Sequence, residues 1–440
     1  MSNKKVILIL LVLSLLTHFL FFGHPNQTVF DEVHFGKFIS GYYTGEYYFD
    51  IHPPLGKLII AGFAELFDFR PEFSFAEIGD KFPDEKYKVL RFLPSLAGAL
   101  LPVVIFLFAL ELGLKQRTAL VAGLFVMFEN ALLVQSRFIL LDSFLLLFGF
   151  SSLWLYLRYR HGKGIYNLIL AGILGSLAVS VKWTGASFLA LAVITEIMTM
   201  MKTRQWRDMG IKIGSFIVLP FVIYFSVFAI HFYLLPRSGE GDAFMSPGFQ
   251  KTLQGNAYQT QADLETPNLF DKFIELNEEM YLSNQRLTAT HPYSSKWYMW
   301  PFMARPIFYW VDDHARIYLL GNPILWWLST AAILYLVTGL LMKRYELDNQ
   351  NSLLLGGYIL NLAPFVGITR VMFLYHYLTA FIFAILILAY LLEREKITKK
   401  VLISIVLLIA ATFIYFAPLS YGLEMKPLIY TRRVWFESWQ

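Results

Sequence analysis

The sequence of 440 residues contains no cysteine, and only 16% of its residues are charged. The absence of cysteine excludes disulfide bonds and thiolate metal sites. The shortage of charge excludes an ordinary soluble domain, in which about a quarter of the residues are charged. The sequence also has no internal repeat and no low-complexity segment. Apolar residues make up 57% of it instead, which points to a membrane environment.

Long apolar runs recur along the chain, and about 20 apolar residues suffice to cross a bilayer as a helix. We therefore predict an all-α polytopic membrane protein with about eleven transmembrane helices. Two long polar segments, near residues 23–88 and 236–321, separate groups of these helices. The predicted spans lie near residues 6–22, 89–110, 118–135, 139–157, 165–181, 185–201, 211–235, 322–342, 352–369, 371–392 and 400–418.

The lysines and arginines of the short connections predict the orientation. With the N-terminus in the cytoplasm, every short inside connection is basic, whereas the short outside turns carry only Arg137, Lys182 and Arg370. The net charge of +5 belongs to these connections, so it does not indicate a nucleic-acid partner. This orientation gathers the unusual polar residues at one membrane boundary. Carriers usually keep their polar groups near the midplane of the membrane. Polar groups gathered at one boundary instead suit an enzyme whose substrate is part lipid and part water-soluble.

Two adjacent acids, Asp31 and Glu32, stand shortly after the first predicted span. Adjacent carboxylates repel each other, and partial burial raises the pKa of at least one of them. A carboxylate of this kind is a suitable general base near neutral pH. The pair is also compatible with a solvated acidic loop, or with the cap of a helix that continues through Phe35–Ile39.

The stretch "FDIHPPLGKL" adds His52 and Lys57 to the same outer segment. Its proline pair ends any preceding helix and can start a new one, and the pattern from Leu55 predicts an amphipathic helix in the interface plane. The alternative is a turn followed by an interfacial helix with no catalytic or binding role. Asp50-x-His52 resembles half of a metal site, but no third ligand is evident from the spacing, so we predict no metal. Dependence on a divalent metal is left open.

Charged residues also stand at the outer ends of predicted spans. The guanidinium of Arg137 suits a lipid phosphate, although it is equally compatible with snorkelling to headgroups. Asp142, one turn deeper, needs a partner that its residue type does not identify. Lys182 lies beside Trp183 at an outer turn. The pair is compatible with a role in binding and, equally, with an aromatic anchor at the membrane interface.

The second outer segment and the turn that follows the ninth span carry two further clusters. "THPYSSKWYMWPFMARPIFYW" can stack on a sugar or peptide and hold a phosphate, or it can dip into the headgroups. "TRVMFLYHYL" places a histidine about 9 Å inside the boundary at 1.5 Å per residue, where hydrogen-bonded packing is the alternative explanation. The candidate residues are His291, Tyr293, Lys296, Trp297 and Arg305 in the first cluster, and Arg370, Tyr375 and His376 in the second.

Six stretches, in this order, resemble the protein O-mannosyltransferases: "DEVHFGKFISGYYTGEYYFDIHPPLGKL", "SRFILLDSF", "SVKWTG", "LPRSGEGDAFMSPGFQKTLQGN", "HPYSSKWYMWP" and "FLYHYL". They run from residue 31 to about residue 380, and the first and fifth are specific to that family. The resemblance implies a C-type glycosyltransferase fold with eleven spans and interfacial helices in the first outer segment. It also implies the extracytoplasmic face of a prokaryotic plasma membrane.

The resemblance implies inverting transfer of mannose from a polyprenyl-phosphate mannose donor to serine or threonine hydroxyls of proteins. Asp31 matches the family's catalytic acidic position, and Glu32 is its neighbour. Direct displacement inverts the anomeric carbon, and cations stabilise the departing phosphate. The residues expected to bind the donor phosphate and sugar are Arg137, Lys182, His52, Lys57, Arg370, Tyr375 and His376. The acceptor is expected to meet His291, Tyr293, Lys296, Trp297 and Arg305.

One departure from the family concerns its eukaryotic members, which carry a large β-trefoil (MIR) domain in the long outer segment. Residues 236–321 are too few for that module and its connections. We therefore expect one membrane-embedded domain over residues 1–440, as in a compact prokaryotic-type member. The departure bears on acceptor specificity and on dimerisation, which the family shows.

Three other functions compete with this interpretation. A sister C-type transferase would use another lipid-phosphate sugar, or a glycan or lipid acceptor. A transporter or flippase predicts polar residues at the midplane of several helices, and the predicted spans are nearly free of them. A noncatalytic scaffold gives no reason for the adjacent acids at 31 and 32.

Overall fold

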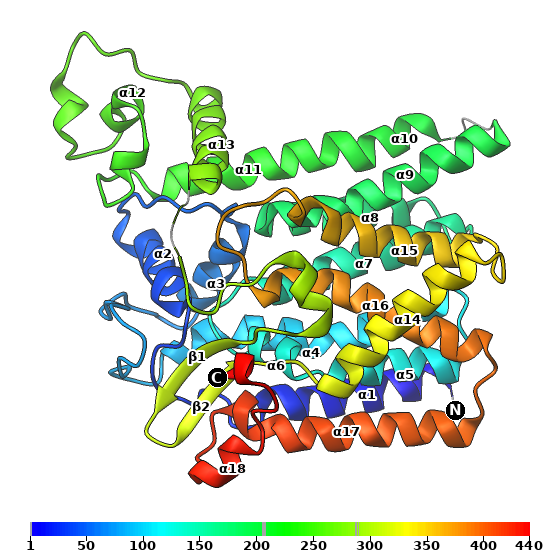
Figure 1. Ribbon diagram of the computed structural model, residues 1–440. Coiled ribbons are helices and arrows are strands. Elements are labelled where there is room, and N and C mark those ends of the chain that lie inside the picture. Colours follow the sequence, from blue (N-terminus) through cyan, green and yellow to red (C-terminus); the bar gives the residue numbers. More distant parts are fainter. Residues whose placement is uncertain (1, 205–207, 287, 289) are drawn as a thin grey trace.

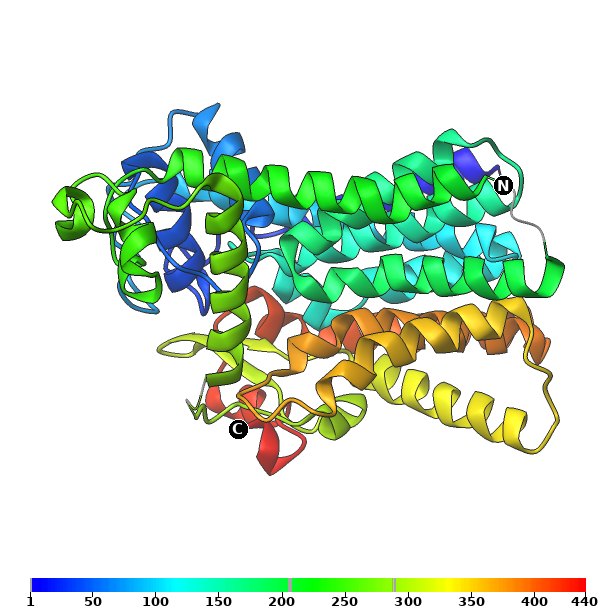
Figure 2. The ribbon, with the colours of Figure 1, turned by 90° about the horizontal axis from the view of Figure 1, so that it is seen from above.

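A computed structural model describes residues 2–204, 208–286, 288 and 290–440. Its long helices run roughly side by side in one bundle (Figure 1, Figure 2). The helices of the bundle are α1 (Asn3–Phe19), α4 (Tyr87–Glu111), α5 (Gln116–Met127), α6 (Asn130–Ser136), α7 (Asp142–Arg160), α8 (Tyr166–Val181), α9 (Ala186–Thr203), α10 (Met209–Ile213), α11 (Leu219–Leu234), α14 (Pro323–Leu341), α15 (Asn349–Leu362), α16 (Leu378–Arg394) and α17 (Lys399–Tyr421).

The remaining elements gather at one end of the bundle, which we call the site end (Figure 1). The N-terminus and the connections from α4 to α5, from α14 to α15 and from α16 to α17 lie at the opposite end, and the C-terminus lies at the site end. The elements of the site end are α2 (Glu32–Thr44), α3 (Leu55–Glu65), α12 (Pro247–Lys251), α13 (Leu269–Arg286), β1 (Ile307–Asp312), β2 (Ala315–Leu319) and α18 (Pro427–Thr431). The expected helices of the first outer segment are therefore present as α2 and α3.

Every predicted span overlaps a helical segment, which confirms a mostly helical, multi-pass membrane architecture. By length and composition, six segments of the described chain can cross a membrane, and α5 with α6 would make a seventh. The prediction of eleven crossings therefore stays a prediction. The core runs through α16, in which every residue from Leu378 to Leu391 is buried.

One predicted span, 118–135, is in fact two helices, because α5 and α6 meet at an angle of 60°. Glu129 stands at the break, and its carboxylate accepts the backbone N–H groups of Leu132 and Asn322, both at 2.7 Å. An N-cap of this kind starts a new helix in a new direction. The apolar pattern runs on through the break, so hydropathy alone does not reveal it.

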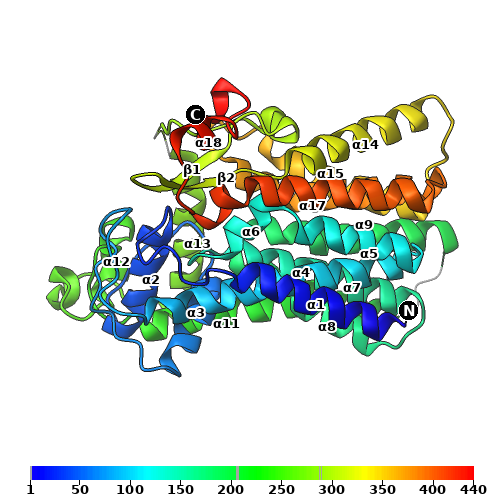
Figure 3. The same cartoon turned by 90° about the horizontal axis from the view of Figure 1, so that it is seen from below.

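A small sheet is the exception to the predicted all-α class. Strands β1 and β2 pair antiparallel, from Ile307 opposite Leu319 to Asp312 opposite Ala315, with a register shift between Phe308 and Trp310. The C-terminal segment lies against this hairpin (Figure 3). The backbone N–H of Met425 donates to the carbonyl of His314 at 3.2 Å.

Candidate active site

Asp31 stands immediately before α2, where the chain turns into the helix. Phe30 holds a left-handed backbone with φ of 44°, which is rare for a bulky residue and costs energy that the surroundings must supply. Its ring stacks on Tyr309 with centroids 4.1 Å apart, and its N–H donates to the Tyr309 carbonyl at 3.2 Å. The half-buried Asp31 carboxylate accepts no hydrogen bond from the described residues and forms no ion pair with them.

The surroundings of Asp31 make its carboxyl a weaker acid than that of a free aspartate. Burial raises the pKa of its carboxyl from 3.8 to about 7, and burial is the largest cause. The Lys182 ammonium opposes this shift, whereas the carboxylates of Asp142 and Asp50 add to it. These three charged groups therefore act on the same region as Asp31.

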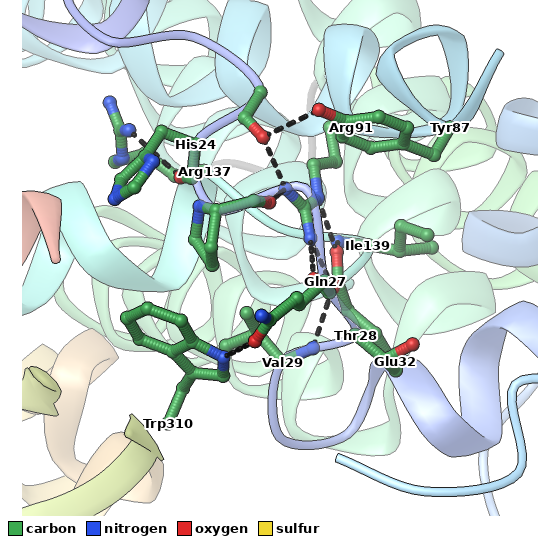
Figure 4. A network of polar contacts seen from close by, with 12 residues as sticks. His24, Gln27, Thr28, Val29, Glu32, Tyr87, Arg91, Arg137, Ile139 and Trp310 are labelled. Carbon is green, nitrogen blue, oxygen red and sulfur yellow. Dashed lines mark hydrogen bonds and ion pairs between the residues drawn. The ribbon is translucent and has the colours of Figure 1, made fainter. Parts of the chain in front are cut away.

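Glu32, the next residue, points into a network that leaves its carboxylate fully occupied (Figure 4). The Arg91 guanidinium donates to it from Nε at 2.7 Å and from Nη2 at 2.6 Å. The backbone N–H groups of Val29 and Ile139 also donate to it, both at 2.9 Å. Both charged side chains are completely buried. These contacts occupy both oxygens of the Glu32 carboxylate, and a shared catalytic role for Glu32 stays a prediction.

Arg91 uses all of its donors in the same network. Besides the two bonds to Glu32, its Nη groups donate to the carbonyls of Gly23, Pro25 and Gln27 at 2.6–3.0 Å. The segment between α1 and α2 is therefore wrapped around one guanidinium, and this segment leads directly to Asp31.

Arg137 makes comparable contacts at the end of α1. Its Nη1 donates to the carbonyl of Leu20 at 2.7 Å, and its Nη2 donates to that of Phe21 at 2.9 Å. The guanidinium also lies 4.7 Å from the centroid of the Tyr421 ring. The side chain is buried, both Nη groups are bonded to backbone carbonyls, and Nε has no hydrogen-bond partner among the described residues. Binding of the donor phosphate by Arg137 stays a prediction.

Lys182 meets Asp142 where α8 ends and α7 begins. The Lys182 Nζ donates to both carboxylate oxygens at 2.9 Å, which identifies the partner that the sequence left open for Asp142. Gln135 Nε2 donates to the same carboxylate at 2.6 Å. The Lys182 Nζ also lies 5.3 Å from the centroid of the Tyr375 ring, so it reaches the second half of the chain.

His52 and Lys57 occupy one side of this region. Burial holds the pKa of His52 well below its usual range, and Lys182 and Lys57 act in the same direction. The Lys57 ammonium forms an ion pair with Asp50 and donates to the His52 carbonyl at 3.0 Å. Lys57 is buried and binds the loop that carries His52, and its role in donor binding stays a prediction.

Arg370, Tyr375 and His376 come from the second half of the chain. The half-buried Arg370 guanidinium donates to the neighbouring Val371 carbonyl at 3.1 Å, and burial lowers its pKa. Because only Nη1 is engaged among the described residues, donors remain for an anion. His376 Nδ1 lies 3.0 Å from the Phe373 carbonyl, and its ring stacks on Trp300 with centroids 5.9 Å apart.

The five outer-loop candidates are only partly brought to the site. The His291 ring lies 5.0 Å from that of Phe373, which in turn contacts Phe30. Arg305 donates to the Pro292 carbonyl and lies over the Tyr293 ring. No contact places the exposed Lys296 or the half-buried Trp297 beside Asp31. Within the described ranges, no group of three His, Asp or Glu side chains is arranged to hold a metal ion.

Three residues of the site were not predicted from the sequence: Arg91, Gln135 and Tyr309. The signal for Arg91 was present, because an arginine inside an apolar span needs a partner. Gln135 and Tyr309 are unremarkable in the sequence and become informative only through their contacts.

Two family models match the chain. That of dolichyl-phosphate-mannose-protein mannosyltransferase covers residues 8–236, more than half of the chain, and that of the C-terminal four TMM region of protein-O-mannosyltransferase covers residues 269–439. The chain belongs to the protein O-mannosyltransferase family.

Individual relatives agree with this family. Protein O-mannosyltransferase 1 of Drosophila pseudoobscura pseudoobscura is 35% identical over 263 residues, which are 56% of this chain and 29% of the relative. The chain matches about a third of the length of its curated relatives. The S. cerevisiae protein O-mannosyltransferase Pmt1-Pmt2 complex bound to the sugar donor superposes with a TM-score of 0.92, at 21% identity, over 100% of this chain and 93% of that one.

A more distant neighbour shares the fold only. The oligosaccharyltransferase of Archaeoglobus fulgidus superposes with a TM-score of 0.57 at 15% identity, over 99% of this chain and 58% of that one. This protein O-mannosyltransferase family member therefore has the C-type glycosyltransferase fold.

Proposed function

We propose that this family member transfers mannose from a polyprenyl-phosphate mannose donor to serine or threonine hydroxyls of proteins. Family membership supports this proposal, as do the relatives named for dolichyl-phosphate mannose and the yeast complex bound to its sugar donor. The observation that carries it is the Asp31 carboxylate. It is half-buried and has no hydrogen-bond partner in the described chain, and burial raises its pKa to about 7.

In the proposed reaction, Asp31 accepts the proton of the acceptor hydroxyl as the hydroxyl oxygen attacks the anomeric carbon. The bond between that carbon and the phosphate oxygen breaks, and the phosphate leaves with the electron pair. Attack from the opposite face inverts the anomeric centre. A base with a pKa close to the working pH is the most effective one for this step.

The departing phosphate needs positive charge where its own charge increases. Arg370 is the candidate for direct contact because it has unused donors, whereas Lys182, whose ammonium is bound to Asp142, would act through its charge. His52, Tyr375 and His376 would contact the sugar around them. Arg137 and Lys57 would act indirectly, because they fix the backbone on which the site is built.

The acceptor is proposed to approach along the second outer segment, where His291 leads to Phe373 and Phe30. We place the site end on the extracytoplasmic side of a prokaryotic plasma membrane. We also infer that residues 1–440 act as one domain without a MIR module, and that no metal takes part. The yeast structure of two paired chains makes dimer formation part of the proposal.

The alternative is a sister C-type transferase with another lipid-phosphate sugar or another acceptor. The A. fulgidus oligosaccharyltransferase shows that the fold alone does not choose between them. The matches to two protein O-mannosyltransferase models favour the mannosyl donor and a protein acceptor.

The test uses the purified full chain, labelled polyprenyl-phosphate mannose and a peptide rich in serine and threonine. We expect label on the peptide with the wild-type protein, and none with Asp31→Asn, which keeps its affinity for the donor. Asp313→Asn is the matched control, because Asp313 is an exposed acid in the hairpin turn. Full transfer by Asp31→Asn would remove Asp31 from the mechanism, and no transfer by the wild type to any peptide would remove the proposed acceptor.

A further inference from the structure

Tyr309 lies on β1 and contacts two parts of the site with different groups of the same residue. It is buried, with 1% of its surface exposed. Its hydroxyl points to α6 and its ring faces the start of α2. These elements come from the first half of the chain, whereas Tyr309 belongs to the second half.

The hydroxyl begins a chain of hydrogen bonds that ends at Lys182. Tyr309 Oη donates to Gln135 Oε1 at 2.5 Å, and Gln135 Nε2 donates to Asp142 at 2.6 Å. Lys182 Nζ donates to both oxygens of that carboxylate at 2.9 Å. The direction of the chain is fixed at each step. An ionised carboxylate only accepts, so the amide must turn its NH₂ group to Asp142 and its oxygen to the tyrosine.

The ring and backbone of Tyr309 hold the residue before Asp31. The Phe30 and Tyr309 rings are nearly parallel, at 7°, with centroids 4.1 Å apart. The Tyr309 carbonyl accepts the Phe30 N–H at 3.2 Å. Phe30 has a left-handed backbone, which persists only where neighbouring contacts enforce it. Tyr309 supplies two of those contacts.

We propose that Tyr309 is a positioning residue that sets the distance between the Asp31 base and the Lys182 cation. The side chain of Tyr309 holds both groups. It packs on Phe30, the residue before Asp31, and it is linked by hydrogen bonds through Gln135 and Asp142 to Lys182. This inference rests on the proposed function, because it assigns the two groups to the acceptor and the phosphate of a single reaction. The hairpin thereby completes a site whose base and cation come from the first half of the chain.

The test separates the two contacts of Tyr309 by substitution in the full-length protein. Tyr309→Phe removes the hydroxyl and keeps the ring, and Tyr309→Leu removes both. The matched control is Tyr318→Phe on β2, because Tyr318 is also buried and its hydroxyl, 2.7 Å from that of Tyr430, is not part of the hydrogen-bond chain to Lys182. Each phenylalanine variant loses one hydrogen bond, but only Tyr309→Phe leaves a buried acceptor, Gln135 Oε1, without its donor. Thermal midpoints are therefore measured for both variants, and kcat is compared at a temperature at which both are folded.

We expect Tyr309→Phe to lower kcat for mannosyl transfer about five- to tenfold, which is the value of one positioning hydrogen bond. Tyr318→Phe should keep the wild-type kcat. Gln135→Leu should lower kcat as well, and the double variant with Tyr309→Phe should match Gln135→Leu alone, since both lie on one chain. Tyr309→Leu should lower kcat further and also alter the pH profile that Asp31 imposes.

Equal kcat values for Tyr309→Phe and Tyr318→Phe would overturn the inference while leaving the proposed function intact. Additive losses in the double variant would also overturn it, because they would show that Tyr309 and Gln135 act separately. Absence of transfer by the wild type would instead overturn the proposed function, and this inference with it.

Discussion

At the residue scale, the two adjacent acids have opposite surroundings. Glu32 is saturated by Arg91 and two backbone N–H groups, so its negative charge is fully compensated. Asp31 receives no such bonds, and burial raises its pKa to about 7. Successive residues at the start of a helix point in directions about 100° apart, which lets one acid anchor the helix while the other faces the site. The anchored acid therefore holds the reactive one in place.

The raised pKa of Asp31 predicts the pH dependence of transfer. The base works only when it is ionised, so kcat/KM for the peptide should fall about tenfold per pH unit below about 7 and level off above it. The midpoint is far above the ordinary value of 3.8 because burial penalises the charged form. Initial rates between about pH 5 and pH 9 test this, with circular dichroism at each pH to exclude unfolding. A flat profile across that range would contradict it.

Residue types alone could predict part of this site. The adjacent acids indicated a carboxylate with a raised pKa, and an acid in a span required a partner, which the structure identifies as Lys182. Residue types could not show which cationic side chains already use their donors within the protein. Arg137 and Arg370 both stand at predicted outer turns, yet only the contacts show that backbone carbonyls occupy both Nη groups of Arg137.

At the scale of elements, two arginines organise the connection between α1 and α2. Arg91 of α4 binds carbonyls between Gly23 and Gln27, and Arg137 after α6 binds carbonyls between His18 and His24. A connection without regular structure leaves buried carbonyls without helical partners, and here the two guanidinium groups bind them. The position of Asp31 depends on helices that are distant in the sequence.

This arrangement predicts that Arg91→Leu is strongly destabilising. Removal of one partner leaves the Glu32 carboxylate buried without its counter-charge, which typically costs about 3–5 kcal/mol. Arg70→Leu is the control, because its ion pair with Asp68 is exposed and should contribute less than about 1 kcal/mol. Unfolding of both variants in mixed detergent micelles measures the difference. Similar losses for the two variants would show that the Arg91 network does not support the fold.

Hydropathy found the helices because a segment in lipid must satisfy its backbone hydrogen bonds internally. It did not find the break at Glu129, since apolar residues continue on both sides of it. It also did not find the hairpin of β1 and β2, although "IFYWVDDHARIYL" has two apolar runs around a polar turn, which is a strand signal. Element type was therefore predictable where the membrane decides it, and less so in the outer segments.

At the scale of the whole molecule, the site draws on both halves of the chain. Asp31, His52 and Lys182 come from the part matched by the first family model, whereas Tyr309, Arg370 and Tyr375 come from the part matched by the second. Their interactions cross the two parts, because the Lys182 ammonium acts on Asp31 and lies 5.3 Å from the centroid of the Tyr375 ring. The long outer segments and the C-terminus lie at one end of the bundle (Figure 1). The distribution of lysine and arginine predicted that the polar clusters share one face of the membrane. It did not predict which residues of the two halves contact each other, such as Tyr309 with Gln135 or Lys182 with Tyr375.

The asymmetry of the bundle leads to a prediction about its orientation in the membrane. Basic short connections stay in the cytoplasm, so the site end should face outward. The chain has no cysteine, and single cysteines can therefore be introduced without a background signal. Ala262→Cys lies in the exposed part of the second outer segment and Lys115→Cys in an exposed connection at the opposite end. In intact cells, a membrane-impermeant maleimide should label Ala262→Cys, whereas Lys115→Cys should react only after permeabilisation. The reverse pattern would place the Asp31 site in the cytoplasm and exclude acceptors that have already crossed the membrane.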